Sequence, residues 1–338
     1  MISRRATLPL LAGIPTIRAI AQPQAGSSVA AQAKPETRLL LGGDVMLTRF
    51  VGRLARQQQD PAWSFRSIAP VFAAADIAFV NLESPFSDHG SPTEKGMIFK
   101  AAPDMIAGLE LAGIDVASTA NNHVRDSDSY GVEFTIDWLN RHGIAAVGTG
   151  KTADEAHAGV VIARNGVRFG FLGYTYDQAN GLRTDVDDRI AAMDLDRMRR
   201  DVASILTRAD AVIVSMHAGW EYNPRPNKQQ IDFAHAAIDA GAAVVAGHHP
   251  HVVQPWEHRG AGVIFYSLGN LVFDQFQRVE TQHGILGEMI FSGNKMVRAG
   301  TIPVDIIGTV PRVAPVKTPA GPIKSPGGAG GAASPPGR

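Results

Sequence analysis

Two histidines two residues apart, His249 and His251, are the strongest candidates for chemistry in this chain of 338 residues. They belong to the segment Gly247-His248-His249-Pro250-His251, which follows an apolar run that we expect to be a buried strand. Imidazoles are the commonest nitrogen ligands for zinc and similar divalent ions, and ordinary surface loops seldom hold three histidines in four positions. The spacing therefore predicts a metal site where this strand enters its loop.

Polar side chains also follow five other apolar runs that we expect to be strands. In open α/β sheets the ligand site lies beyond the carboxyl ends of the strands, so these groups should converge in one crevice although they are distant in sequence. The groups concerned are Asp44 after Gly42-Gly43, Asn81 and Glu83, Asn121-Asn122-His123, His217, and Asn270 after Gly269. Together with the paired histidines they predict a metal centre built from both halves of the chain.

Each of these groups also has an ordinary structural explanation when it is considered alone. Asp44 after two glycines could cap a helix or a turn, and Asn121-Asn122 could form a left-handed turn. Glu83 could be a surface acid, and a single histidine such as His217 is more often hydrogen-bonded or exposed than metal-bound. The ordinary explanation must hold independently at six strand ends, so a shared metal site is the better interpretation.

The elements that must position these groups alternate between short apolar strands and amphipathic helices, which indicates β-α-β units on a largely parallel sheet. Asn165-Gly166 predicts a hairpin from Gly159 to Tyr174, and residues 284–307 repeat this pattern with a turn near Ser292-Gly293-Asn294. Hairpins in a parallel pattern imply a mixed sheet or two packed sheets. The expected strands are Arg38 to Leu41, Ile77 to Val80, Val116 to Thr119, Ala145 to Val147, Ala211 to Met216, Ala243 to Ala246 and Val263 to Ser267. The expected helices are Phe65 to Ala74, Asp104 to Ala112, Val132 to Arg141, Leu195 to Thr207 and Lys228 to Ala240.

Composition excludes several classes of protein. Lys plus Arg and Asp plus Glu both total 32, so no net field would attract nucleic acid or an anionic membrane. Cysteine is absent, which excludes thiolate catalysis, iron-sulfur ligation and disulfides and leaves nitrogen and oxygen ligands for any metal. A His-Glu-x-x-His metalloprotease helix and a Gly-x-Ser-x-Gly hydrolase elbow are also missing.

The two ends of the chain differ in composition from its middle. Residues 1–21 have an arginine pair, Arg4-Arg5, before a short apolar stretch and a small-x-small sequence, which predicts an export signal peptide that resembles a twin-arginine signal. The apolar segment is about ten residues long, whereas a membrane span needs about 20, so an uncleaved anchor is the weaker interpretation. We expect a linker over 22–36, one domain over 37–309 and a disordered Pro/Gly-rich tail over 310–338.

Six motifs in order make the chain resemble a known family. They are Gly43-Asp44-Val45-Met46, Asn81-Leu82-Glu83, Asn121-Asn122-His123, Ser215-Met216-His217-Ala218-Gly219-Trp220-Glu221-Tyr222, His249-Pro250-His251-Val252-Val253-Gln254 and Tyr266-Ser267-Leu268-Gly269-Asn270. This series, which extends from about Arg38 to Phe273, resembles the CapA family of capsule and poly-gamma-glutamate synthesis proteins, which is related to calcineurin-like metallophosphoesterases. The resemblance implies an α/β fold of two packed mixed β-sheets flanked by helices, a four-layer sandwich with its site in the loops at one end.

The resemblance also implies roles for individual residues. Asp44 and His251 would bind a first metal, Glu83 would bridge two metals, and the second metal would be bound by Asn122, His217 and His249. His123 would protonate a leaving oxygen and is the catalytic candidate. The cofactors would be one or two divalent ions, of Mn, Zn, Fe or Mg, which can activate water and stabilise an in-line displacement. Substrate or supporting roles are assigned to Asn81, Asn121, Glu221, Arg225, His248 and Asn270, of which Glu221 and Arg225 could equally be ordinary surface residues, and His248 could be exposed.

One position departs from the metallophosphoesterase pattern. Those enzymes begin with Asp-x-His, whereas Asp44-Val45-Met46 places a thioether where the imidazole should be, and methionine is a poor ligand for hard or borderline ions. Glu83 in place of the bridging aspartate adds a methylene. Both changes leave open a single tightly bound metal, a weak second one or an altered reaction.

Two kinds of function follow from these features. The first is an exported, periplasmic or envelope-associated metal-dependent hydrolase or transferase that acts on a phosphoester or a cell-envelope polymer. The second is a non-catalytic, metal-stabilised accessory protein that binds, exports or tethers an anionic capsule polymer such as poly-gamma-glutamate. Capsule-synthesis membrane proteins are the partners implied for either function, and nucleic acid is not expected.

Overall fold

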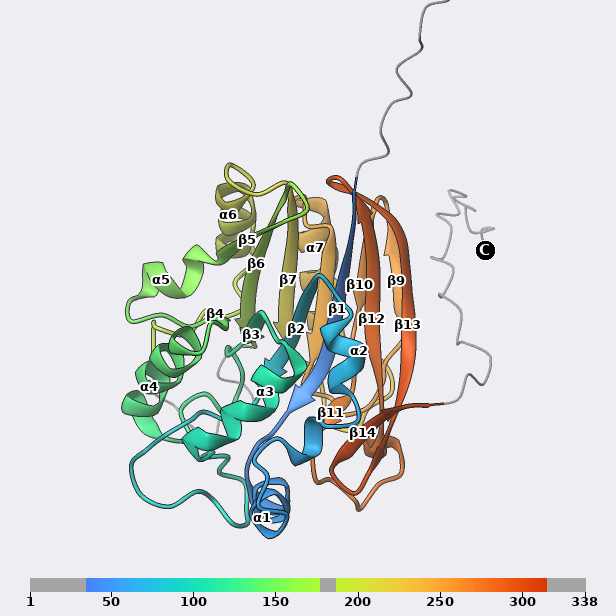
Figure 1. Cartoon of the computed structure of the whole chain (residues 1–338). Helices are drawn as coiled ribbons and strands as arrows, with labels where there is room; N and C mark the ends of the chain where they lie inside the picture. Colours follow the sequence, from blue (N-terminus) through green and yellow to red (C-terminus); the bar gives the residue numbers. More distant parts are fainter. Residues whose placement is uncertain (1–34, 177–186, 315–338) are drawn as a thin grey trace, which may run out of the picture. The chain divides into compact units, whose positions relative to one another are not determined.

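The computed structural model describes residues 35–176 and 187–314, which form two β-sheets and the helices that cover them. The expected signal peptide and most of the expected linker and tail lie outside the described residues. Figure 1 shows the two sheets face to face. The first contains β1 (Glu36–Val45), β2 (Ile77–Leu82), β3 (Val116–Ser118), β4 (Ala145–Val147), β11 (Asn270–Val272), β12 (His283–Ser292), β13 (Lys295–Ile307) and β14 (Val310–Val313). The second contains β5 (Val160–Arg164), β6 (Val167–Thr175), β7 (Ala211–His217), β8 (Val244–His248), β9 (Trp256–Arg259) and β10 (Gly262–Phe265).

Strand order explains how distant segments come together. The first sheet has the order β14-β13-β12-β1-β2-β3-β4, with β11 beside β1, and the second has the order β5-β6-β7-β8-β10-β9. Neighbouring strands β1, β2, β3 and β4 are parallel, as are β6, β7, β8 and β10, whereas β5–β6 and β12–β13 are antiparallel. The mixed sheets and both predicted hairpins are therefore confirmed.

The helices flank the sheets on their outer faces. They are α1 (Arg49–Gln57), α2 (Ala69–Ala73), α3 (Ile106–Ala112), α4 (Asp128–Arg141), α5 (Ala153–Ala158), α6 (Leu195–Ile205) and α7 (Lys228–Asp239), with short 3-10 turns at Trp63–Phe65, Pro103–Met105 and Glu280–Gln282. Helices α1 to α4 pack on the first sheet, and α5 to α7 pack on the second. Within the described residues, no helix has the length and apolar character needed to cross a membrane.

A third apolar cluster fills the space between the two sheets. Side chains alternate along each strand, so Ala78 and Val80 of β2 face the helices while Ile77 and Phe79 face the other sheet. Phe79 stacks on Phe171 of β6 with ring centroids 6.1 Å apart and planes inclined by 9°. The order helix, sheet, sheet, helix confirms the predicted four-layer α/β sandwich.

Two expected boundaries are wrong. A continuous helix from Phe65 to Ala74 is replaced by a 3-10 turn and the short helix α2, because Pro70 has no N–H to donate within a longer helix. The domain does not end at Thr309, because β14 pairs antiparallel with the end of β13 after a turn at Gly308, whose φ is 66°. Pro311 is tolerated there because β14 is an edge strand.

Two glycines allow the backbone segments beneath the polar strand ends to approach closely. A Cβ atom at Gly43 would lie 2.0 Å from the carbonyl oxygen of Gly269, and one at Gly247 would lie 2.0 Å from that of Tyr266. Any side chain at these positions would force β1 or β8 away from the segment beside it. The glycines that precede Asp44 and His248 therefore set the spacing of the site.

Candidate metal centre

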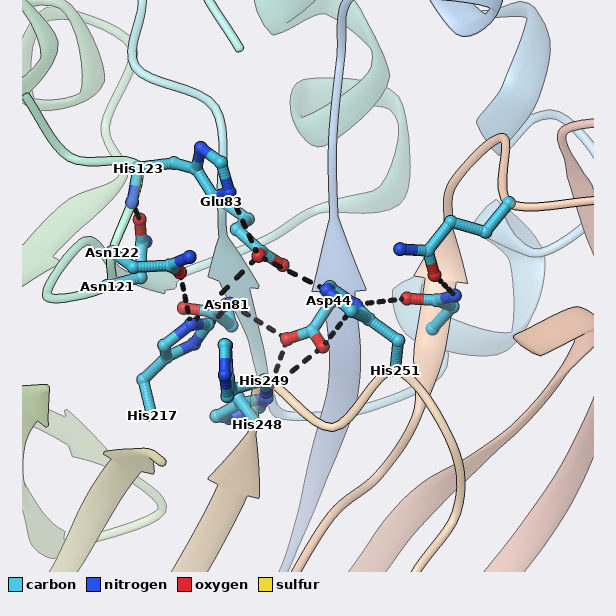
Figure 2. A network of polar contacts seen from close by, with 12 residues as sticks. Asp44, Asn81, Glu83, Asn121, Asn122, His123, His217, His248, His249 and His251 are labelled. Atoms are coloured by element: carbon cyan, nitrogen blue, oxygen red, sulfur yellow. Dashed lines mark hydrogen bonds and ion pairs between the residues drawn. The ribbon is translucent and has the colours of Figure 1, made fainter. Parts of the chain in front are cut away.

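The polar residues predicted at the strand ends lie together in one cluster, and all of them except Asn122, which is exposed, are buried (Figure 2). The parallel register of β1 and β2 places Asp44 opposite Asn81, and that of β7 and β8 places His217 opposite His248. Asn270 opens β11, opposite Asp44. Side chains from residue 44 to residue 270 thus meet at the carboxyl ends of the parallel strands.

Glu83 is the least satisfied group of this cluster. Its side chain is fully buried, and neither carboxylate oxygen has a hydrogen-bond partner. The Nε2 atoms of three histidines surround Oε1, with His251 at 3.6 Å and both His123 and His217 at 4.0 Å. Burial raises the pKa of Glu83 well above its usual range, against the attraction of His251. An ionised carboxylate in these surroundings is costly unless a cation compensates it.

Asp44 is equally buried but is surrounded by donors. Oδ1 accepts a hydrogen bond from Asn81 Nδ2 at 2.8 Å, and Oδ2 accepts one from the backbone N–H of His249 at 3.2 Å. The Nδ1 atoms of His248 and His251 approach the two oxygens at 3.5 and 3.4 Å. Burial alone would raise the pKa of Asp44, but the bonds from His248 and His251 hold it well below its usual range.

The histidine loop has an unusual backbone. His249 and His251 have φ angles of 96° and 57°, a region that non-glycine residues seldom occupy. The loop is held there by the hydrogen bond from the His249 N–H to Asp44 and by one from the Tyr222 N–H to the Pro250 carbonyl, which is 2.8 Å long. Such strain persists only where the surrounding structure enforces it, and it is concentrated at functional sites.

Asn270 determines how His251 is oriented. Its Nδ2 donates to Gln275 Oε1 at 3.1 Å and to the Thr281 carbonyl at 3.0 Å, so Oδ1 is the atom that faces His251 Nδ1, at 3.0 Å. Nδ1 therefore donates, and Nε2 is directed at Glu83. Burial would lower the pKa of His251, but Glu83 and Asp44 outweigh it and raise this pKa to about 9.

His217 and His249 are neutral imidazoles. His217 Nε2 lies 2.8 Å from Asn122 Oδ1, and Nδ1 lies 3.3 Å from Asn81 Nδ2. Burial and the neighbouring His249 keep the pKa of His217 well below its usual range, and burial together with His251 lowers the pKa of His249 to about 3. Neutral imidazoles are the form that binds metals.

His123 is held by two residues that the sequence did not indicate. Its Nδ1 donates to Asp126 Oδ2 at 2.7 Å, and its ring stacks on Phe99 with centroids 3.8 Å apart. Asp126 also accepts the Phe99 N–H at 2.6 Å, so all three groups are fixed together. The spacing of three residues between His123 and Asp126 was a usable signal, whereas nothing in the sequence singled out Phe99.

The remaining candidates occupy three different environments. Asn121 shapes the loop, since Nδ2 donates to the Leu82 carbonyl at 2.8 Å and Oδ1 accepts the His123 N–H at 3.1 Å. Glu221 and Arg225 are exposed, although the charge of Glu221 contributes to raising the pKa values of Glu83 and His251. His248 is fully buried beside Asp44, which fits the supporting role expected for it and not the exposed alternative.

Met46 does not face the centre as a ligand. It is fully buried in the apolar cluster between the first sheet and its helices, and its Sδ accepts the Thr48 N–H at 3.3 Å. The side chain therefore belongs to the core, and the first metal position proposed by the resemblance has no imidazole from this strand.

The donor set fits a divalent cation. Glu83, His249 and His251 each offer one ligand atom, these atoms lie within 4.8 Å of one another, and all three residues are buried. A carboxylate without hydrogen bonds and an imidazole whose orientation is fixed by another side chain, as Asn270 fixes His251, are features of a nitrogen and oxygen site for a divalent ion. The cluster could hold a metal ion, as expected.

The structure thus defines the class of this protein: a four-layer α/β sandwich with a buried group of carboxylate and imidazole side chains at its strand ends that could hold a metal ion. Residues 38–275 match the model of the bacterial capsule synthesis protein PGA_cap. The chain belongs to this family, the CapA family of capsule synthesis proteins.

Three relatives show the range of the match. The PGA biosynthesis protein CapA of Bacillus subtilis is 30% identical over 279 residues, covering 81% of this chain and 72% of the relative. The capsule biosynthesis protein CapA of Bacillus anthracis is 31% identical over 242 residues, covering 69% and 59%. A probable polyglutamine synthesis accessory protein of Mycobacterium tuberculosis is 26% identical over 283 residues, covering 70% and 74%.

A solved structure shares the fold. A hypothetical protein from Thermus thermophilus is 17% identical, with a TM-score of 0.50 over 79% of this chain and 99% of that protein. At this identity the likeness concerns the arrangement of the sheets and helices and carries no information about substrate.

Proposed function

We propose that this member of the capsule synthesis family is an exported, metal-dependent hydrolase or transferase that acts on a phosphoester or on an envelope polymer. The observation that supports the proposal most strongly is Glu83, a fully buried carboxylate with no hydrogen bond to either oxygen and histidine nitrogens at 3.6 and 4.0 Å. An isolated buried charge is costly unless a cation compensates it. A fold that keeps this arrangement is built to hold a cation.

Each residue around the centre has a separate role in the proposed reaction. A divalent cation bound here would polarise an oxygen of the substrate. Asp126 holds His123 Nδ1, which leaves Nε2 facing Glu83 as the atom that gives or accepts a proton. Phe99 stacks on one face of the imidazole and so helps to fix its orientation. Asn270 holds His251 so that Nε2 stays directed at the centre.

Export and the polymer partner rest on the sequence and on the names of the relatives. The arginine pair and short apolar stretch of residues 1–21 support export, and relatives are named for PGA biosynthesis and capsule biosynthesis. An anionic envelope polymer is therefore the substrate or partner that we propose, with capsule-synthesis membrane proteins as its context. The chain spans 59% of the length of the Bacillus anthracis relative.

A second function is favoured by Met46. Because this side chain is committed to the core, the centre lacks the imidazole that metallophosphoesterases have at this position. A cation held by fewer ligands would still stabilise the loops and attract carboxylates of a polymer. The alternative is therefore a non-catalytic accessory protein that binds, exports or tethers an anionic capsule polymer.

Hydrolysis assays separate the two functions. The purified chain would be loaded with Mn²⁺, Zn²⁺ or Mg²⁺ and tested on an aryl phosphodiester and on poly-gamma-glutamate, and we expect turnover that is lost in His123→Ala. His142→Ala is a matched control, since this histidine is partly exposed and pairs with Glu110 away from the centre. A chain that binds the ion and cleaves neither substrate with any metal would favour the accessory function.

A further inference from the structure

The residues around the centre differ in whether their polar side-chain atoms already have hydrogen-bond partners in the protein. Asp44, Asn122 and His217 have protein partners for their ligand atoms, whereas Glu83 has none. A metal ligand must offer a lone pair to the ion, so a group that is engaged on every side has to break protein hydrogen bonds before it can bind one. This difference bears on how many ions the centre holds.

We propose that the centre holds a single divalent ion between Glu83, His249 and His251, and that Asp44 positions the histidine loop instead of binding an ion. This inference depends on the metal centre of the proposed function but not on catalysis. It replaces the two-metal arrangement that the family resemblance implies, and it gives Asp44 a different role.

The first argument is that both oxygens of Asp44 already accept hydrogen bonds. Oδ1 accepts one from Asn81 Nδ2 at 2.8 Å and Oδ2 accepts one from the His249 N–H at 3.2 Å, while the Nδ1 atoms of His248 and His251 lie 3.5 and 3.4 Å away. These groups come from β2, β8 and the histidine loop, so the carboxylate joins both sheets. An anchor of this kind fixes the loop, whereas a ligand would need an oxygen that faces the ion.

The second argument is the orientation of His251. Glu83 lies at the Nε2 edge of its ring, at 3.6 Å, whereas Asp44 lies at the Nδ1 edge, at 3.4 Å. The two nitrogens of an imidazole point away from each other, and Asn270 Oδ1 also occupies the Nδ1 side. An ion bound to Nε2 would therefore contact Glu83 and lie beyond the reach of Asp44. Carboxylate to histidine to metal is a common supporting arrangement.

The third argument concerns the opposite side of the centre. Asn122 Oδ1 and His217 Nε2 are 2.8 Å apart and satisfy each other, and His217 Nδ1 is 3.3 Å from the Asn81 amide. A second ion would have to displace this bond. Met46, which might have supported an ion near Asp44, lies in the apolar core. Among the described residues, Glu83, His249 and His251 form the group of histidine and carboxylate side chains whose ligand atoms lie within 4.8 Å of one another.

The test is the number of ions bound by the whole chain. Protein stripped with a chelator would be dialysed against Mn²⁺ or Zn²⁺, and the metal content would be measured by mass spectrometry and the affinity by titration calorimetry. We expect one ion in the wild type, one ion bound about 10–100-fold more weakly in Asp44→Asn, and one ion in His217→Gln. Glu83→Gln should bind none at the same concentrations.

A second measurement needs no variant and so does not depend on the folding of Asp44→Asn. The electron paramagnetic resonance of Mn²⁺-loaded wild type should be the hyperfine-split spectrum of an isolated ion. Two ions per wild-type chain, a drop to one in Asp44→Asn, or the spectrum of an exchange-coupled pair would overturn the inference. One bound ion without any hydrolysis would leave it intact and count against the proposed enzyme.

Discussion

Asp44 and Glu83 stand near the ends of neighbouring strands, and both side chains are fully buried, yet their surroundings are opposite. Asp44 receives hydrogen bonds from Asn81 and the loop backbone and has its pKa lowered, whereas Glu83 receives none and has its pKa raised by burial. A carboxylate whose two oxygens both accept hydrogen bonds from the protein is stabilised as part of the scaffold. A carboxylate without donors is left for a ligand, which makes Glu83 the functional member of the pair.

A third buried acid outside the centre supports this distinction. Asp201 of α6 accepts hydrogen bonds from His157 Nδ1 at 2.7 Å, Tyr174 Oη at 2.9 Å and Arg197 Nε at 3.0 Å. Like Asp44, it accepts hydrogen bonds on both oxygens, although it lies on α6 and is not part of the centre. Asp44 and Asp201 are thus hydrogen-bonded carboxylates that stabilise the fold. Of these three acids, Glu83 is the one whose oxygens accept no hydrogen bond.

The largest expected effect is the loss of the ion in Glu83→Gln. An amide lacks the charge that compensates a divalent cation. Loss of a hydrogen bond that supports a ligand lowers metal affinity by up to about 100-fold, and loss of the ligand Glu83 should lower it by more than that. Calorimetric titration with Mn²⁺ measures this. Glu110→Gln, at an exposed acid paired with His142, is the control and should bind the ion as the wild type does. Unchanged binding in Glu83→Gln would remove the basis of the comparison.

His123→Ala separates the binding of the ion from the chemistry. Removal of the proton donor should lower kcat by about 10²- to 10⁴-fold, while the metal content stays the same, since His123 Nε2 lies 4.0 Å from Glu83. Steady-state kinetics and metal analysis on the same preparation check both parts. Asp126→Asn should reduce kcat less and alter its pH profile, because it changes only the hydrogen bond to Nδ1. Equal loss of metal and activity in His123→Ala would assign it a ligand role.

The stability of the metal-free protein should respond in opposite ways to the two acids. Asp44→Asn leaves the buried donors of Asn81 and the His249 N–H facing an amide nitrogen or a weaker acceptor, which should cost about 2–3 kcal/mol of unfolding free energy. Glu83→Gln replaces a buried carboxyl group that has no hydrogen bonds with an uncharged amide and should leave the stability equal or higher. Chemical denaturation in the presence of a chelator measures both. A larger loss in Glu83→Gln than in Asp44→Asn would reverse the assignment.

Met46→His tests whether the missing imidazole can be restored. Because Met46 is buried among apolar side chains, the polar ring should destabilise the fold by about 2 kcal/mol and add no second ion. Thermal unfolding and metal analysis are sufficient, with Met46→Leu as the volume-matched control. A second bound ion in Met46→His would show that the site beside Asp44 is only one ligand short.

The smallest effect is expected at Asp201. Its pKa is lowered from the ordinary value of 3.8: burial opposes this, but the bonds from His157 and Tyr174 outweigh it. The stability that it contributes is therefore present above pH 3.8 and is lost as the pH falls below that value through the lowered native pKa. Denaturation curves over this acid range should lose part of their pH dependence in Asp201→Asn, with metal content unchanged.

Much of the fold could be predicted because strand and hairpin signals are local. Asn165-Gly166 defined one hairpin, and apolar runs ending in polar residues defined the strands that carry Asp44 and His217. The helix expected over Phe65 to Ala74 failed because one proline outweighed the apolar periodicity. The edge strand β14 was missed because the Pro/Gly content of the segment concealed its pairing with β13.

The site could be predicted as a set of residues but not as a set of roles. Strand-end position indicated Glu83, His249 and His251, yet which oxygens already have donors depends on side-chain geometry between strands. Packing determines that a backbone N–H donates to Asp44 and that Met46 and His248 are buried. The spacing of residues in the sequence does not indicate these contacts. Phe99 reaches His123 from a loop and therefore left no pattern in the sequence.

The most direct test of the account is anomalous diffraction from a crystal of the whole chain soaked in Mn²⁺. We expect one anomalous peak within ligand distance of Glu83, His249 and His251, with the Asp44 carboxylate still bonded to Asn81 and the His249 N–H. Two peaks, or one peak coordinated by Asp44, would contradict the claim that Glu83 holds the ion while Asp44 holds the loop.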